Sequence, residues 1–403
     1  MKKIYLDYAS TTPLDQEVFE KMKPLFWEDF GNPSSVHSMG QLAGAAVESS
    51  RTKIAKFLNC SPVEIIFTSG ATESNNLAIK GLVKKYHETR GKDALLPHII
   101  ASTIEHHCVL DACKSLEKEG LAEITLVPVN SDGIMEIEKV NNAIQENTIL
   151  VSVMYVNNEI GTIQPIKEIG KMIRVLNENR KEKILFHTDA VQALNYVDCD
   201  VSELGADMLS FSGHKIYGPK GIGALYLKKD AKISPIIHGG GQESGLRAGT
   251  YNVPGIVGMG EAVTNIKTNQ DENNQKLQEL RDYLMERILT EIPESHVNGS
   301  RKKRIPNNAN FRFANVEGES LLLSMDMEGI CASTGSACSS GSLDPSHVIL
   351  ALGLKHEEAH SSLRLTIGKR TTKEDIDHAV DVIKETIERL RRISGNLLEE
   401  FNK

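Results

Sequence analysis

A lysine follows a predicted buried strand near the middle of the sequence. Residues 207–212 are largely apolar, and the segment Ser212-Gly213-His214-Lys215 closes this stretch. A lysine at the end of a buried strand is costly unless its amine is bonded or neutralised. A Schiff base with an aldehyde cofactor removes that cost and gives the lysine a chemical role. Ser212 and His214 add hydrogen-bond donors that suit a phosphate, although the segment alone is equally compatible with a surface lysine in a turn.

A second segment leads from an apolar strand through glycine into a predicted helix. Residues 65–68 are followed by Gly70, Ala71 and Thr72. Exposed backbone N–H groups and the helix dipole make such a junction a binding site for anions, and the Thr72 hydroxyl adds a donor. An ordinary helix cap has the same pattern, so this turn is weak support when taken alone.

Asp189 and Gln192 follow another apolar stretch, 184–188. Open α/β sheets bind their ligands at the carboxyl ends of the strands. A carboxylate at that position can pair with the protonated pyridine nitrogen of pyridoxal phosphate (PLP), which keeps the cofactor an electron sink. Gln192 would lie on the same side and reach the phenolic oxygen of the ring. The alternative for Asp189 is a helix N-cap.

His106 and two asparagines occupy further predicted strand ends. His106 follows 98–102, and an imidazole there can stack on the cofactor ring and move protons, since its pKa lies near neutral pH. Asn157 and Asn158 follow 148–155 and offer amides at the same edge. An anion site, an imidazole, a carboxylate and a lysine thus converge, which favours a PLP site over the separate structural explanations.

Cys338 lies in a segment, 332–342, that consists almost entirely of glycine, serine and alanine. Such a composition predicts mobility, and packing does not explain a cysteine within it, whereas Cys331 beside Ile330 fits a core. A thiol on a mobile arm suits a group that visits a pocket and then leaves. Downstream, Arg364 begins a predicted strand and can clamp the α-carboxylate of an amino-acid substrate.

Predicted strands and helices alternate from about residue 60 to 230. Near-continuous apolar strands separated by helices, at 72–86, 107–119 and 165–179, predict an α/β fold with a mainly parallel seven-stranded sheet covered on both faces. The strands are predicted at 64–68, 98–102, 124–129, 148–155, 184–188, 207–212 and 222–227.

The C-terminal part has a different pattern, and 403 residues favour two domains. A long helix is predicted at 253–292, strands at 310–313 and 363–367, and an amphipathic helix at 373–393. Thr372 and Asp375 form a capping box before the last helix. We expect a large domain at 15–260 and a smaller α+β domain. The smaller domain would comprise 1–14 and 261–403 and carry the cysteine loop, at about 332–343.

Composition excludes several classes of function. The formal net charge of −8 provides no footprint for nucleic acid, and the longest apolar run, 149–156, is too short to span a bilayer. The N-terminus has no apolar signal-peptide core. These features predict a cytoplasmic protein, in which thiols stay reduced. The six cysteines have no paired metal-ligand spacing, which predicts no metal site.

These motifs together resemble those of the group I cysteine desulfurases, the NifS and IscS kind, in the class V aminotransferase superfamily. The resemblance covers nearly the whole chain. The matching motifs lie at 6–13, 30–33, 68–74, 156–161 and 212–221. It implies a fold-type I PLP-dependent transferase that acts as a homodimer and converts L-cysteine to L-alanine, with the sulfur transferred to an enzyme cysteine.

The resemblance also implies a role for each motif residue. The catalytic residues would be Lys215, which binds PLP, His106, which stacks on it, and Cys338, the persulfide nucleophile. Further cofactor-binding residues would be Ala71, Thr72, Asn158, Asp189, Gln192, Ser212, His214 and, from the partner subunit, Thr250. Substrate-binding residues would be Asn32, Asn158 and Arg364.

An Fe–S scaffold or a tRNA-thiolation enzyme would accept the sulfur. Cys338 would at most ligate a partner's Fe–S cluster transiently, with no resident metal. An aminotransferase or a selenocysteine lyase on the same fold is one alternative, and a PLP-binding platform that assembles sulfur-transfer partners is another. The arm bearing Cys338 disfavours an aminotransferase, and Lys215 with Cys338 disfavours a pure scaffold.

Overall fold

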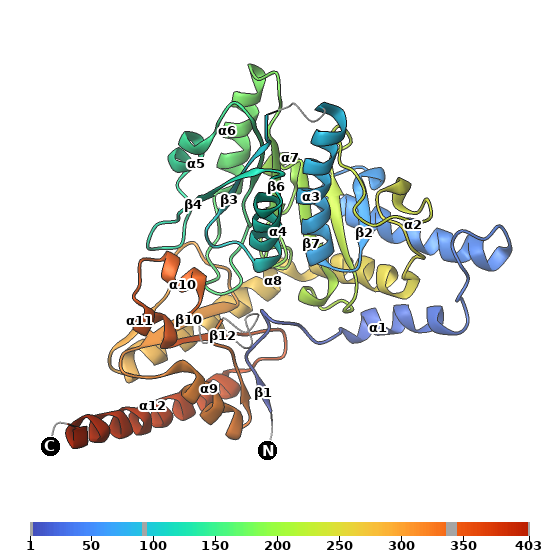
Figure 1. The fold of residues 1–403 in the computed structure, drawn as a ribbon. Helices are drawn as coiled ribbons and strands as arrows, with labels where there is room; N and C mark the ends of the chain where they lie inside the picture. Colours follow the sequence, from blue (N-terminus) through green and yellow to red (C-terminus); the bar gives the residue numbers. More distant parts are fainter. Residues whose placement is uncertain (1–2, 91–94, 336–344, 402–403) are drawn as a thin grey trace.

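Seven strands form the central sheet of the molecule (Figure 1). The computed structural model describes residues 3–90, 95–335 and 345–401. Six strands run in the same direction, and one, β8, is antiparallel to both of its neighbours. The predicted mainly parallel sheet is therefore confirmed. In sheet order the strands are β2 (Ile65–Thr68), β8 (Gly223–Leu227), β7 (Met208–Ser212), β6 (Leu185–Asp189), β5 (Thr148–Ser152), β3 (His98–Ser102) and β4 (Glu123–Val127).

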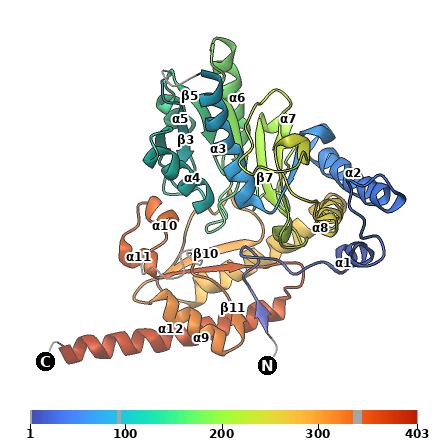
Figure 2. The ribbon, with the colours of Figure 1, turned by 45° about the vertical axis from the view of Figure 1, so that its right-hand side comes forward.

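Helices cover both faces of this sheet. Successive side chains along a strand point to opposite sides, so neighbouring apolar residues pack against different helices. Ile99 packs in one apolar cluster with α3 (Ala71–Arg90) and α4 (His107–Lys118). Ile100, the next residue, packs in the cluster on the other face, with the first half of α8 (Val253–Glu291). Figures 1 and 2 both show α3 and α4 side by side.

A second, smaller sheet lies below the first in the view of Figure 1. The second half of α8 packs on it together with α9 (Gly318–Met327) and α12 (Lys373–Phe401), in a separate apolar cluster. The long helix α8 therefore contributes to the cores of both sheets. The smaller sheet is antiparallel and has the order β12 (Ser362–Thr366), β10 (Asn308–Phe313) and β9 (Ser295–Val297).

The N-terminal segment connects the two sheets. Strand β1 (Ile4–Tyr5) pairs with β11 (Ile330–Cys331). The Leu6 carbonyl then accepts a hydrogen bond from the backbone N–H of Thr366 in β12, at 2.7 Å. Six residues later, the backbone N–H of Thr12 donates to the carbonyl of His214 after β7, at 2.9 Å. Residues 7–12 therefore pass directly from the smaller sheet to the carboxyl edge of the larger one.

The predicted boundaries agree with the structure to within a few residues for most elements. The predicted strand 148–155 is longer than β5, but its last residues still follow β6, because the N–H of Tyr155 donates to the Asp189 carbonyl at 2.9 Å. The predicted capping box is confirmed. Thr372 N donates to Asp375 Oδ2 at 3.1 Å, and Asp375 N donates to Thr372 Oγ1 at 3.2 Å.

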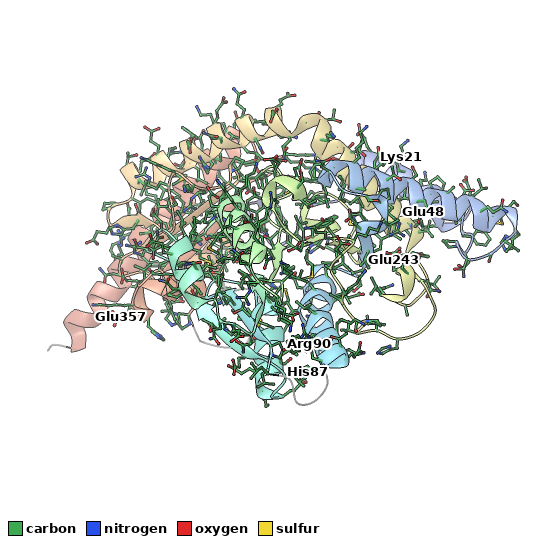
Figure 3. All side chains as sticks on the ribbon, turned by 90° about the horizontal axis from the view of Figure 1, so that it is seen from above. Lys21, Glu48, His87, Arg90, Glu243 and Glu357 are labelled. Carbon is green, nitrogen blue, oxygen red and sulfur yellow. The ribbon has the colours of Figure 1, made fainter. Side chains whose placement is uncertain are left out.

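A buried ion pair ties helix α2 (Ser38–Leu58) to the loop after β8. Both Nη atoms of Arg51 donate to the Glu243 carboxylate, at 2.9 and 2.7 Å. Glu243 Oε2 also accepts the N–H of Phe67 in β2, at 2.8 Å. Arg51 pairs with Glu48 as well, at 3.1 Å, but the Glu48 side chain is 64% exposed and that of Glu243 is 2% exposed. Figure 3 labels both glutamates, on the same side of the molecule.

We predict that Glu243→Ala destabilises the fold by about 3–5 kcal/mol, because it leaves the Arg51 charge buried and without its main partner. Glu48→Ala removes the exposed partner of the same arginine and should cost no more than about 1 kcal/mol. Urea denaturation at fixed protein concentration, followed by circular dichroism, measures both values. An equal loss of unfolding free energy in the two variants would show that the buried Arg51–Glu243 pair contributes no more to stability than the exposed Arg51–Glu48 pair.

Candidate active site

A cavity of about 630 Å³ lies at the carboxyl ends of β2, β3, β6 and β7. The strand ends meet there because these four strands are parallel. Ten of the residues predicted from the sequence line this cavity. They are Ala71, Thr72, His106, Asn158, Asp189, Gln192, Ser212, His214, Lys215 and Arg364.

The anion-binding end of the cavity is formed by the start of α3. Ala71 is the first residue of this helix and Thr72 the second, so their backbone N–H groups carry the positive end of the helix dipole. His214 lies beside them in the cavity lining, and its Nδ1 is 3.1 Å from Thr11 Oγ1. Burial, together with the charges of Lys215 and Lys220, lowers the pKa of His214 to about 4. His214 is therefore neutral at neutral pH and can donate one hydrogen bond to a phosphate.

Lys215 is held by the N-terminal segment. Its Nζ donates to the carbonyls of Ala9 and Ser10, each at 2.6 Å. The backbone N–H and the hydroxyl of Thr12 donate to the carbonyl of His214, the residue before Lys215. The N-terminal segment therefore holds both the backbone beside Lys215 and its side-chain amine. Two carbonyl acceptors keep the Lys215 amine at the cavity.

Asp189 is a buried carboxylate that faces the cavity. Its Oδ1 accepts the N–H of Val191 at 3.0 Å, and its Oδ2 accepts Asn75 Nδ2 at 2.7 Å. No ion pair joins Asp189 to a cation among the described residues. Gln192 donates its amide to the carbonyl of Ala9 at 2.8 Å, so the predicted contact with a phenolic oxygen requires this nitrogen to be shared or released.

His106 caps helix α4 from the cavity side. Its Nδ1 accepts the backbone N–H of Cys108 at 3.2 Å and lies 3.0 Å from Cys108 Sγ. Burial lowers the pKa of His106 below its ordinary value, and the carboxylate of Asp189 opposes this effect, while Lys215 adds to it. The structure therefore favours a neutral imidazole at this position.

Arg364 enters the cavity from β12 of the smaller sheet. Its Nη2 pairs with Asp7 at 2.8 Å, and its Nη1 donates to the Asn158 carbonyl at 3.0 Å. Its Nε is buried without a hydrogen-bond partner in the described part of the chain. An unpaired donor on a rigid guanidinium fits a carboxylate ligand.

Two predicted site residues, Asn32 and Thr250, do not line this cavity. Asn32 is exposed, and its Oδ1 accepts the N–H of Ser34 at 3.0 Å. Thr250 is exposed as well, and neither residue lines the cavity of its own chain. Cys338 lies outside the described residues.

Asn157 and Asn158 were both expected to offer amides at this edge of the sheet, but the structure separates their roles. The Asn157 side chain is buried. Its Nδ2 donates to the Ile104 carbonyl at 2.9 Å, and its Oδ1 accepts two backbone N–H groups. Of the two asparagines, therefore, only Asn158 lines the cavity. Asn75 and Cys108 were not predicted from the sequence. Lys220 and residues 9–11 were given no role either, although they lie within the matching motifs 212–221 and 6–13.

These residues fit pyridoxal phosphate. A helix start can bind its phosphate, and a lysine can bind its aldehyde. A buried carboxylate that forms no ion pair with the described residues can pair with a protonated ring nitrogen. The described residues contain no cluster of three side chains suited to a metal ion. In the described part of the chain no helix is long and apolar enough to cross a membrane.

Comparison with known proteins agrees with this chemistry. The family model for class-V aminotransferases matches residues 4–379. The chain is 51% identical to a cysteine desulfurase, IscS, of Dictyoglomus turgidum, over 98% of this chain and 96% of the relative. Among solved structures, a NifS-like protein has a TM-score of 0.87 and 35% identity, covering 96% of this chain and 100% of that one. SspA in complex with cysteine has a TM-score of 0.79 and 39% identity, with 92% and 100% covered.

The match extends over both sheets and includes the cavity, so it covers the parts of the chain from which the site is built. Enzymes of this family depend on pyridoxal phosphate, the cofactor that the residues of the cavity fit. The chain belongs to the cysteine desulfurases of the class-V aminotransferase family.

Proposed function

We propose that this enzyme takes sulfur from L-cysteine, releases L-alanine and holds the sulfur as a persulfide on Cys338 before transfer to an acceptor protein. The observation that carries this proposal is the meeting of Lys215, Asp189, His106 and Arg364 around one cavity. An amine, a ring-nitrogen partner, a stacking imidazole and a carboxylate clamp together define a site for an amino acid on PLP.

The chain positions the cofactor and the substrate from several sides. PLP, when bound, supplies an electron sink for the Cα of an amino acid. Ala71, Thr72, Ser212 and His214 would hold its phosphate. Lys215 would bind its aldehyde and, once displaced by substrate, move the proton at Cα. The carbonyls of Ala9 and Ser10 hold the Lys215 amine at the cavity.

Arg364 would orient the substrate through its α-carboxylate. The ion pair with Asp7 fixes the guanidinium before substrate arrives, so little side-chain entropy is lost on binding. Asn158 lies next to it in the lining and would donate its amide to the same carboxylate or to the cofactor.

Cys338 would act as a thiolate on the substrate sulfur. The S–S bond of the persulfide forms as the carbon–sulfur bond of the substrate breaks, and the carbon skeleton takes up protons to become alanine. A free cysteine has a pKa of about 8.5, so the site must remove the thiol proton on arrival. His106 or the substrate amine would accept it.

The active unit would be a homodimer in the cytoplasm, with Thr250 of each subunit bonded to the phosphate bound by its partner. Its exposure in a loop outside the cavity of its own chain supports this placement. An Fe–S scaffold or a tRNA-thiolation enzyme would accept the sulfur.

We expect the purified protein to be yellow, with an absorption band that borohydride bleaches as it fixes the cofactor to Lys215. Lys215→Ala should lose this covalent band. Lys220→Ala is a matched control, because Lys220 lines the same cavity, and it should keep the band. Peptide mapping of the reduced adduct identifies the lysine, and an adduct on Lys220 would show that the assignment is wrong.

Cys338→Ser should fold and bind the cofactor and L-cysteine normally, because Lys215 and Arg364 are unchanged. Its alanine production should nevertheless fall by at least about a hundredfold, since a hydroxyl is a far poorer nucleophile towards sulfur than a thiolate. Cys331→Ser, seven residues earlier, should retain turnover. Mass spectrometry should find an adduct of about 32 Da, one sulfur atom, on Cys338 of the wild type. Wild-type turnover in Cys338→Ser, or an adduct on Cys331, would refute the mechanism.

Mixed dimers test the role of Thr250. Thr250→Val should weaken cofactor binding about tenfold or more, the effect of losing a hydrogen bond to a charged group. A dimer of one Lys215→Ala chain and one Thr250→Val chain would contain one complete site if Thr250 acts across the interface. Spectrophotometric titration should then find one tight, borohydride-sensitive site per mixed dimer. Finding none would place Thr250 in the site of its own chain, and wild-type cofactor binding by the Thr250→Val homodimer would place it outside the site.

A further inference from the structure

A chain of hydrogen bonds joins Asp189 to His106 through two side chains that the proposed mechanism does not use. Asn75 Nδ2, on α3, lies 2.7 Å from Asp189 Oδ2 and 3.1 Å from Cys108 Sγ. Cys108 Sγ, on α4, lies 3.0 Å from His106 Nδ1. The chain therefore runs beneath the cavity, from the carboxylate for the ring nitrogen to the stacking imidazole.

The direction of each hydrogen bond in this chain is fixed by the groups at its ends. The Asp189 carboxylate only accepts, so the Asn75 amide must present its nitrogen, and that nitrogen donates one hydrogen to Asp189 and the other to Cys108. The backbone N–H of Cys108 donates to His106 Nδ1 at 3.2 Å, so Nδ1 is an acceptor. The thiol, which accepts from Asn75, therefore donates its own hydrogen to Nδ1.

The Asn75 amide supports the same interpretation. Its side chain is fully buried, and its Oδ1 has no hydrogen-bond partner among the described residues, although a buried polar atom without a partner is costly. An asparagine with an unused oxygen and two used hydrogens serves as a double donor. A residue needed only for packing would not require this arrangement.

Cys108 remains a thiol in this environment. Burial and the nearby Asp189 carboxylate raise the pKa of Cys108 to about 12, against the opposing effect of hydrogen bonds from Asn75 and Thr72. The hydrogen needed for donation to His106 is thus present throughout the neutral range.

We propose that Asn75 and Cys108 are positioning residues that hold His106 as the neutral imidazole with its hydrogen on Nε2. Two donors at Nδ1, one from the backbone and one from the thiol, disfavour a proton at that nitrogen. This inference rests on the proposed role of His106 at the cofactor, and it assigns the protonation state and tautomer in which the imidazole performs that role.

Other charged and titratable groups also act on His106 and must stay unchanged in the test. Asp189 raises its pKa, whereas Lys215, His107 and His347 lower it. None of these four residues is altered by a substitution at position 108.

Substitutions at Cys108 test the proposal in the holoenzyme without substrate. Histidines labelled with ¹³C and ¹⁵N report the tautomer and pKa of His106 by NMR, and its resonance is identified by its loss in His106→Asn. Cys108→Ala and Cys108→Val both remove the donor, and each should raise the pKa of His106 by about half to one unit. Cys108→Ser keeps a donor and should titrate like the wild type. Cys113→Ala, at a buried cysteine of the same helix, is the packing control and should leave His106 unchanged.

A wild-type pKa in Cys108→Ala, a wild-type pKa in Cys108→Val, or an equal shift in Cys108→Ser would each overturn the proposal. Hydrogen on Nδ1 of the wild-type enzyme would overturn it as well. The resonance is read without turnover, so these outcomes do not depend on whether Cys338 accepts sulfur. The pH profile of alanine production should change in the same variants. Its acidic limb should move to higher pH in Cys108→Ala and Cys108→Val and stay in place in Cys108→Ser.

Discussion

The parallel direction of β2, β3, β6 and β7 is the constraint on which the site depends. Each strand is largely apolar, because helices cover both faces, and the side chains that line the cavity lie at or just after its end. Parallel strands bring those ends to one edge. Groups separated by more than a hundred residues, such as Thr72 and Lys215, therefore line one cavity.

The N-terminal segment closes this edge and couples it to the smaller sheet. Asp7 fixes Arg364, and the carbonyls of Ala9 and Ser10 hold Lys215. The positions of Arg364 and Lys215 thus depend on six consecutive residues, 7–12. The Arg51–Glu243 pair has a similar function on the opposite side, where it holds the loop after β8 against β2 and helix α2.

Strand ends were readable from the sequence because apolar runs followed by Gly, Asp, His or Lys mark both the element and its chemistry. Helix α2 was not predicted, since its buried face includes Gly40, Ala43 and Ser50, which give little periodic apolar signal. The capping box at Thr372 was predicted because its pattern is local. Asn75 and Cys108 were missed for the opposite reason, because their partners come from other elements and only the fold brings them together.

Asn32 and Thr250 are both exposed and lie away from the cavity of their own chain. Thr250 was assigned to the site of the partner subunit, so its position in its own chain leaves that assignment a prediction. The polar network below the cavity adds a further level of organisation. It links Asp189, the proposed partner of the ring nitrogen, to His106, the proposed stacking imidazole, so the two groups are not independent.

The central claim is that one cavity orients both cofactor and amino acid. A crystal structure of the Cys338→Ser holoenzyme soaked with L-cysteine tests it most directly. We predict the pyridine nitrogen within hydrogen-bond distance of Asp189, the phosphate at the start of α3, and the substrate carboxylate on Arg364. A cofactor bound in another orientation, or a substrate carboxylate away from Arg364, would contradict the account.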